Sequence, residues 1–174
     1  MADTVALLHS SLTVPHAYPL TVVFCEYLHL SEGEAFRAHV HRDGDHVGYI
    51  ENYGDSYGEA RFVPLDFDVF GLHDFHRFVT ECRSNGEPVS DQQVLGALLD
   101  EYETSLALGV QVGRGRTLAR QVADGYAATF VEVDRPQSRA GRRRLAGQLP
   151  SEPGHRWEVW TGFRWEPLEP PPPK

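Results

Sequence analysis

The sequence predicts an α+β fold in which an antiparallel β-meander forms the sheet and two or three helices pack on one face of it. Two turn signals, at residues 42–45 and 54–57, divide the stretch 34–66 into three segments of strand character. Apolar residues recur at three- and four-residue spacing between residues 72 and 106, which is typical of amphipathic helices. A Trp-rich stretch over 156–168 then returns to strand character. Together these patterns predict a sheet of five or more strands covered by helices.

The length of 174 residues suits a single domain over 1–168, followed by a Pro-rich tail over 169–174. Hydrophobic residues make up 41% of the chain, which is enough for a packed core. No apolar run approaches the roughly 18 residues that span a bilayer, and Cys25 and Cys82 lack metal-type spacing. We therefore expect a reduced, cytoplasmic protein that does not contact a membrane. One lysine against fifteen arginines indicates the codon usage of a high-GC bacterial genome.

The first half of the chain is expected to supply most of the strands. Residues 18–30 form a short apolar run that suits a buried strand. In the meander, a turn centred on Asp43-Gly44 places His41 opposite His46. The same register places Val40 opposite Val47. The predicted core face carries Phe36, Ala38, Val40, Val47, Tyr49, Ala60 and Phe62. The predicted outer face carries Arg37, His39, His41, His46, Ile50, Arg61 and Val63.

Two helices are expected after the meander. The first covers residues 72–83, and the second begins at Ser90, three residues before Gln93, in the pattern of a capping box. The apolar stripe of the second helix contains Val94, Leu95, Leu98, Leu99, Tyr102 and Leu106. Its acidic residues Asp100, Glu101 and Glu103 are expected to face water. A short third helix is expected over 117–124, where Gly125 ends it.

The C-terminal part is expected to contain two strand segments separated by a mobile basic loop. Residues 126–133 have strand character, and residues 156–168 are interpreted as a hairpin that turns at Thr161-Gly162. Between them, residues 134–154 have no apolar period and contain several arginines. The prolines at 170–173 predict an extended polyproline tail.

Charge is distributed unevenly along the chain, whose formal net charge is −9. Residues 1–110 contain eighteen acidic side chains and five arginines, a balance of −13. Residues 111–174 contain seven acidic side chains, ten arginines and one lysine, a balance of +4. An asymmetry of this size is typical of a protein with a charged interaction surface.

Three histidines form a pattern that is compatible with metal chemistry. His39 and His41 are two residues apart on the same side of a strand, and His46 faces them across the turn. Three imidazoles on one face resemble a zinc ligand set that leaves an open position for water. Arg37 on the same face opposes cation binding by electrostatic repulsion. Two interpretations are therefore open: a divalent-metal site such as zinc at His39, His41 and His46, or solvated histidines that need no cofactor.

The second turn of the meander carries a different candidate site. Tyr53 and Tyr57 lie at this turn, and the acidic residues Asp55 and Glu59 are next to them in the sequence. Exposed tyrosines are effective interface anchors, because the ring is large, stiff and amphipathic. We therefore assign Tyr53, Asp55, Tyr57 and Glu59 to the binding of a protein partner with a basic surface.

The basic loop carries a candidate anion- or nucleic-acid-binding site, which consists of Arg139, Arg142, Arg143 and Arg144. Such arginines can contact the phosphates of a nucleic acid. The acidic balance of the whole chain, and the absence of aromatic residues among these arginines, weaken the case for nucleic acid.

The sequence contains no complete catalytic constellation, so we favour a non-enzymatic function. We expect a small acidic accessory or regulatory protein that acts by binding a protein partner. A small metal-dependent enzyme with a three-histidine site is the first alternative. A nucleic-acid-associated protein that uses the arginines between 139 and 144 is the second.

Overall fold

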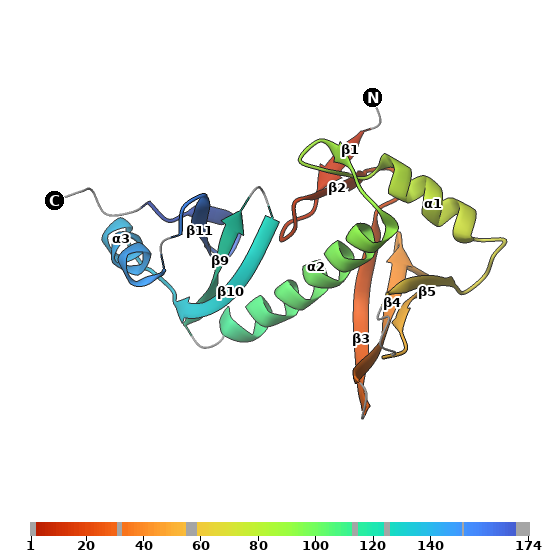
Figure 1. Ribbon diagram of the computed structural model, residues 1–174, viewed down its shortest axis with the longest axis horizontal. Helices are drawn as coiled ribbons and strands as arrows, with labels where there is room; N and C mark the ends of the chain where they lie inside the picture. The colour runs from red at the N-terminus through yellow and green to blue at the C-terminus, as the bar shows by residue number, and fades with distance from the viewer. Residues whose placement is uncertain are drawn as a thin grey trace. The chain divides into compact units, whose positions relative to one another are not determined.

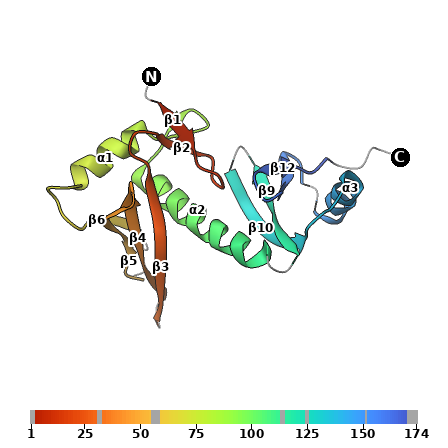
Figure 2. The same cartoon turned by 180° about the vertical axis from the view of Figure 1, so that it is seen from behind.

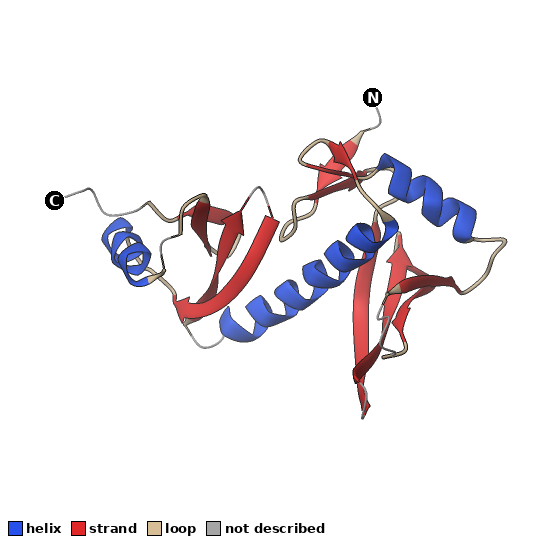
Figure 3. Cartoon of the chain, in the orientation of Figure 1, coloured by secondary structure: helices blue, strands red, loops and turns tan. Residues whose placement is uncertain are grey.

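The computed structural model describes residues 3–30, 33–54, 59–112, 115–123, 126–150 and 152–169. Within these ranges the chain forms three antiparallel sheets of four strands each and three helices (Figure 1, Figure 3). Strands make up 44% of the structure. The predicted fold class, a meander-based sheet with helices packed on one face, is therefore wrong. The fold is β-rich, and its strands are divided among three sheets because segments outside the meander also pair with one another.

The chain folds into two compact units, residues 1–103 (unit 1) and residues 104–174 (unit 2). The elements are β1 (Thr4–Ala6), β2 (Leu12–Pro15), β3 (Leu20–Leu30), β4 (Gly33–Arg42), β5 (Asp45–Asn52), β6 (Arg61–Pro64), α1 (Leu72–Glu81), β7 (Arg83–Ser84), β8 (Glu87–Pro88), α2 (Asp91–Val112), β9 (Arg116–Ala123), β10 (Tyr126–Asp134), α3 (Arg139–Gln148), β11 (His155–Trp160) and β12 (Trp165–Pro167). Helix α2 contributes residues to both units. Unit 1 has the formal balance of −13 and unit 2 the balance of +4, because residues 104–110 carry no charge. The expectation of one domain over 1–168 stays a prediction.

Unit 1 contains two of the sheets, α1 and the first part of α2. One sheet has the strand order β1-β2-β7-β8, and the other has the order β3-β4-β5-β6 (Figure 2). Both sheets and both helices contribute to one hydrophobic core, whose burial is the main favourable term in folding. Its buried residues are Leu12, Val14, Leu20, Ala38, Val40, Val47, Ile50, Phe62, Phe70, Phe75, Phe78, Val79, Cys82, Val94, Leu95 and Leu98.

The hairpin of β4 and β5 turns at Asp43-Gly44, as predicted. Both turn residues have positive φ angles, 51° and 90°, which a tight two-residue hairpin turn requires. His41 pairs with His46 beside the turn, also as predicted. The three histidines of this hairpin therefore reach the same face of the sheet.

A β-bulge in β5 changes which side chains reach the core. Val40 pairs with Gly48 and not, as predicted, with Val47. Val47 and Gly48 therefore both face the core. The side chains after them lie on the faces opposite to those that the sequence predicts. Ile50 is fully buried, although it was expected on the outer face, and Tyr49 contacts the histidines there, although it was expected in the core. A period of two could not predict this exchange, because it assumes an uninterrupted ladder.

Both predicted helices of unit 1 are present, as α1 and the first part of α2. The capping box at the start of α2 is confirmed. The Gln93 side-chain oxygen accepts a hydrogen bond from the Ser90 backbone N–H (2.8 Å), and the Ser90 hydroxyl oxygen accepts one from the Gln93 N–H (3.3 Å). Leu95 and Leu98 are buried, as predicted, whereas Leu106 of the same predicted stripe is 56% exposed.

Glu101 of α2 was expected to face water, but its carboxylate holds the loop between β1 and β2. Its oxygens accept hydrogen bonds from the backbone N–H groups of Leu8 (2.8 Å), His9 (2.8 Å) and Ser10 (3.1 Å). These bonds satisfy backbone donors that the strands do not use, and their charged acceptor strengthens them. The helix therefore also organises the first hairpin of the chain.

A short helix was expected over 117–124, but residues 117–123 belong to β9, in the middle of the unit 2 sheet, and Asp124 lies outside the described residues. This sheet has the order β10-β9-β11-β12. Leu118 packs with Leu108 and Trp160, whereas the adjacent Ala119 joins a separate cluster. Because both faces of β9 are covered, apolar residues occupy consecutive positions and no period of two marks the strand.

Residues 134–154, expected as a mobile loop, contain helix α3. Ser138 caps its N-terminus, since the hydroxyl oxygen accepts a hydrogen bond from the Gly141 N–H (3.1 Å). Leu145 and Ala146 pack against the sheet. The sequence shows no apolar period here because the apolar contacts are confined to the last turns of the helix. The prolines at 170–173 lie outside the described residues.

We expect Gly48→Ala to lower the free energy of unfolding by about 1–3 kcal/mol, as overpacked cores do. A Cβ at Gly48 would lie 2.6 Å from the Val63 carbonyl oxygen and 2.7 Å from the Phe62 ring. Gly96→Ala in α2 is the matched control, because the added Cβ meets open space and Ala stabilises a helix by about 0.5–1 kcal/mol over Gly. Urea denaturation of both variants measures the difference. Equal stabilities would show that the bulge does not constrain the core.

Candidate functional site

The outer face of the β3-β4-β5-β6 sheet carries three rows of side chains that cross the strands. The charged row consists of Glu26, Arg37, Glu51 and Arg61. The aromatic row consists of Phe24, His39, Tyr49 and Val63. The third row consists of Thr21, His41 and His46. Side chains opposite each other in an antiparallel ladder are direct neighbours, so each row runs across the strands of the sheet. These residues are called the outer face below.

His39, His41 and His46 lie together on the outer face, but their rings are stacked. The His46 ring is nearly parallel to those of His39 and His41, whose centroids are 4.9 and 5.2 Å away. His41 Nδ1 and His46 Nε2 lie 2.9 and 3.0 Å from backbone carbonyl oxygens and must carry the hydrogen, because a carbonyl only accepts. In the part of the chain that the structure describes, no group of three or more His, Cys, Asp or Glu side chains is placed to hold a metal ion.

His39 is at the centre of an aromatic cluster. Phe24 and Tyr49 meet its ring edge-on, with centroids 5.4 and 5.0 Å away. Burial lowers the pKa of His39, and the neighbouring His46 lowers it further, because two positive rings repel each other. Glu26 acts in the opposite direction without cancelling these effects. At neutral pH His39 is therefore an uncharged ring beside the half-exposed Phe24.

The charged row depends on Glu51, a buried carboxylate. It accepts hydrogen bonds from Arg37 Nε (2.7 Å) and from the Tyr53 hydroxyl (2.5 Å). The Arg61 guanidinium lies over the Tyr53 ring, 4.4 Å from its centroid. Burial by itself raises the pKa of Glu51, but the hydrogen bonds from Tyr53 and Arg37 outweigh burial and lower the pKa. Glu51 is therefore ionised at neutral pH and holds Tyr53 in place.

Two of the four residues assigned to partner binding lie in the described part of the chain. Tyr53 is 55% exposed and Glu59 is also exposed. Asp55 and Tyr57 lie outside the described residues. Tyr53 lines a cavity of about 320 Å³ at the border of the outer face, together with Glu26, Tyr27, Leu28, Arg37 and Glu51. Of the four residues predicted to bind a partner, Tyr53 therefore adjoins the outer face.

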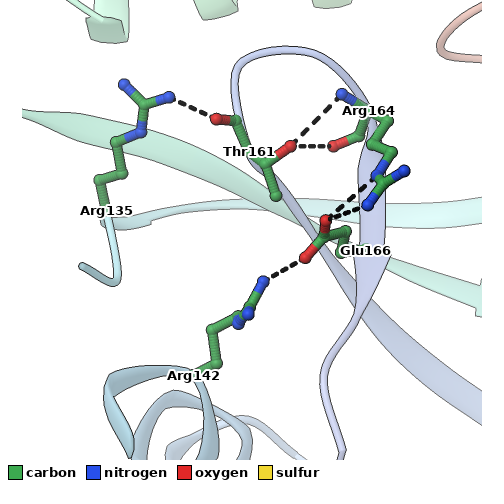
Figure 4. Close-up of polar contacts among 5 residues, drawn as sticks. All are labelled: Arg135, Arg142, Thr161, Arg164 and Glu166. Carbon is green, nitrogen blue, oxygen red and sulfur yellow. Dashed lines mark hydrogen bonds and ion pairs between the residues drawn. The ribbon is translucent and has the colours of Figure 1, made fainter. Parts of the chain in front are cut away.

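All four residues predicted to bind an anion lie on α3, namely Arg139, Arg142, Arg143 and Arg144. The structure adds two arginines that the sequence patterns did not single out. Arg164 binds the carboxylate of Glu166 together with Arg142, and Arg135 donates to the backbone carbonyl oxygen of Thr161 (Figure 4). The alternation of charged and aromatic residues in Arg164-Trp165-Glu166 could have indicated the contact between Arg164 and Glu166. Side chains two residues apart in extended backbone lie on the same side, and Arg164 directly precedes β12.

Two cavities adjoin the Glu166 carboxylate and share Arg142, Arg164 and Glu166 in their walls. The first, of about 530 Å³, is also lined by Arg139, Arg143, Trp165, Pro167 and Glu169. The second, of about 510 Å³, is also lined by Arg135, Ser138, Trp160, Thr161 and Phe163, among others. The two cavities together are called the arginine groove below.

We expect the free energy of unfolding to fall as the pH is lowered through about 6.5, the ordinary pKa of histidine, in part because of His39. The pKa of His39 is lowered in the folded protein, so the unfolded chain binds more protons in this range. The loss is complete below the folded-state pKa. His39→Phe removes this titration and keeps an aromatic ring, so its stability should depend less on pH. Denaturation between pH 7.5 and 5.5 tests this, and parallel profiles for the two proteins would contradict it.

No protein-family model, curated protein or solved structure matches this chain. Among the described residues, no helix is both long enough and apolar enough to cross a membrane. Proposals for its function therefore depend on the geometry of the outer face and of the arginine groove.

Proposed function

We propose that this chain is a non-enzymatic accessory or regulatory protein that binds a protein partner through the outer face of unit 1. The observation that carries the proposal is the aromatic row, in which Phe24 is 50% exposed on an open sheet face. A sheet face that meets only water normally carries polar residues at such positions. An exposed aromatic side chain surrounded by polar and charged residues is typical of the centre of a protein interface.

The residues around Phe24 are ordered by contacts within the unit. His39 and Tyr49 pack against each other edge to face, and Glu51 fixes Tyr53 at the border of the surface. An interface whose anchors are already ordered loses less side-chain entropy when a partner binds. This favours the recognition of a folded partner.

The charge of unit 1 supports a partner with a basic surface. The unit has a formal balance of −13, and the exposed residues Asp43 and Asp45 lie at the turn next to the third row. Opposite charges accelerate the encounter of two proteins, and salt screens this attraction. The aromatic row then provides contacts that hold the complex together.

We expect Phe24→Ser to weaken partner binding by about tenfold or more, the loss typical of an aromatic anchor. Phe67→Ser is the matched control, because Phe67 is 67% exposed but lies outside the outer face. Chemical crosslinking in the native host with each protein identifies a candidate partner, and calorimetry with the purified partner then measures affinity. Circular dichroism confirms that both variants are folded. Equal affinity of wild type and Phe24→Ser would contradict the proposal.

We also expect Asp55→Asn combined with Glu59→Gln to slow association with that partner by about threefold or more, with a smaller effect on dissociation. The same change of charge at Asp68 and Glu87, which are exposed elsewhere in unit 1, is the control. Stopped-flow measurements at two salt concentrations separate the two rates. If neutralising Asp55 and Glu59 leaves association unchanged, the partner does not approach along this turn.

A further inference from the structure

We infer that unit 2 carries a second binding site, the arginine groove, which binds single-stranded nucleic acid. This site is independent of the partner surface on unit 1. It joins arginines of α3 to the β11–β12 hairpin that follows α3 in the chain (Figure 4). The argument depends on the charge of the groove, on the geometry of its guanidinium groups and on an exposed aromatic ring beside them.

The groove has an excess of positive charge. Five arginines line the two cavities, whereas Glu166 and Glu169 are the acidic residues among their lining residues. Unit 2 as a whole has a formal balance of +4. The negative balance of the complete chain comes from residues 1–103, which form unit 1, and not from the unit that contains the groove. The acidic composition therefore does not argue against a polyanion in this groove.

Glu166 orients two arginines of the groove, Arg142 and Arg164, and Glu169 pairs with a third, Arg139. Glu166 Oε1 accepts hydrogen bonds from Arg164 Nε (3.1 Å) and Nη2 (2.9 Å), and Glu166 Oε2 accepts one from Arg142. Arg135 is held by the Thr161 carbonyl oxygen. A guanidinium has five N–H donors in a rigid fork that matches phosphate oxygens, so these contacts hold each group and leave donors for a ligand. Phosphate groups can therefore bind here to arginines that are already ordered.

Phe163 provides a surface on which a base can stack. It lies in the turn between β11 and β12, is 87% exposed and lines the same cavity as Arg135 and Arg164. Phe163 belongs to neither of the hydrophobic clusters found among the described residues of unit 2. Bases of any kind stack on aromatic rings, and proteins that bind single strands combine such rings with a basic groove. An acidic peptide would use the arginines but would gain no stacking from Phe163.

The size of the groove also favours a chain of phosphates over one small anion. The two cavities have volumes of about 530 and 510 Å³ and share three of their lining residues. Arg139 and Arg143 line one of them and Arg135 the other, so positive charge extends along the groove. Successive phosphates of a single strand match this distribution of charge.

Binding of a fluorescein-labelled 15-mer of deoxythymidine to the full-length protein, measured by fluorescence anisotropy, tests the inference. We expect saturable binding at 50 mM NaCl that weakens steeply up to 200 mM NaCl. Phe163→Ala should weaken binding by about tenfold without changing the salt dependence, since stacking is not ionic. Combining Arg139→Gln with Arg143→Gln should reduce the slope of log affinity against log salt by about 1.4, or about 0.7 for each lost phosphate contact.

Arg156→Gln is the matched control, because Arg156 is 64% exposed and lines neither cavity of the groove. It should bind the oligonucleotide more tightly than the variant at Arg139 and Arg143. Phe24→Ser should bind it as the wild type does, which separates this inference from the proposed function. The inference is overturned if the wild type shows no saturable binding at 50 mM NaCl, or if Phe163→Ala binds equally well. Equal competition by a poly-glutamate peptide would overturn it in favour of an acidic protein ligand.

Discussion

The arrangement of unit 1 depends on the β-bulge at Val47 and Gly48. Because both residues face the core, each later side chain of β5 lies on the opposite face of the sheet from the one that an uninterrupted ladder would give it. Ile50 reaches the core as a consequence, and Tyr49 joins the aromatic row. The absence of a side chain at Gly48 is what permits this, since the Phe62 ring occupies the space that a Cβ would need. A packing constraint on the core side of the sheet thus determines which residues a partner would meet on the other side.

The two units carry opposite charge, but both candidate surfaces use a carboxylate to order their binding residues. In unit 1, Glu51 is buried and holds Tyr53 at the border of the outer face. In unit 2, Glu166 binds Arg142 and Arg164, and the hydrogen bonds from Arg164, together with the positive charge of both arginines, lower the pKa of Glu166. Such preorganisation reduces the entropy lost when a ligand binds. In both proposed binding surfaces, some of the residues that would contact a ligand are therefore already held in place by a carboxylate.

Prediction from sequence succeeded where neighbouring residues specify an element. The Asp43-Gly44 turn adopts positive φ angles, and the capping box uses Ser90 and Gln93, three residues apart. The prediction of a helix over 117–124 is wrong because β10 and β11 pair on either side of β9 and both of its faces are covered. The prediction of a loop over 134–154 misses helix α3 because Leu145 and Ala146, near the end of the helix, supply its apolar contacts with the sheet. In both cases the decisive contacts involve residues outside any local window.

The sequence by itself determined that the three histidines of the β4–β5 hairpin share one face, because a two-residue turn and strand alternation are local properties. It also determined the separation of charge between the two parts of the chain. Only the tertiary structure decided that Tyr49, and not Ile50, joins the histidines, since the bulge places Gly48 against the Phe62 ring of β6 and Ile50 in the core. It alone placed Arg142 and Arg164 on Glu166, because helix α3 meets the hairpin that follows it only when its apolar residues pack against the sheet of unit 2.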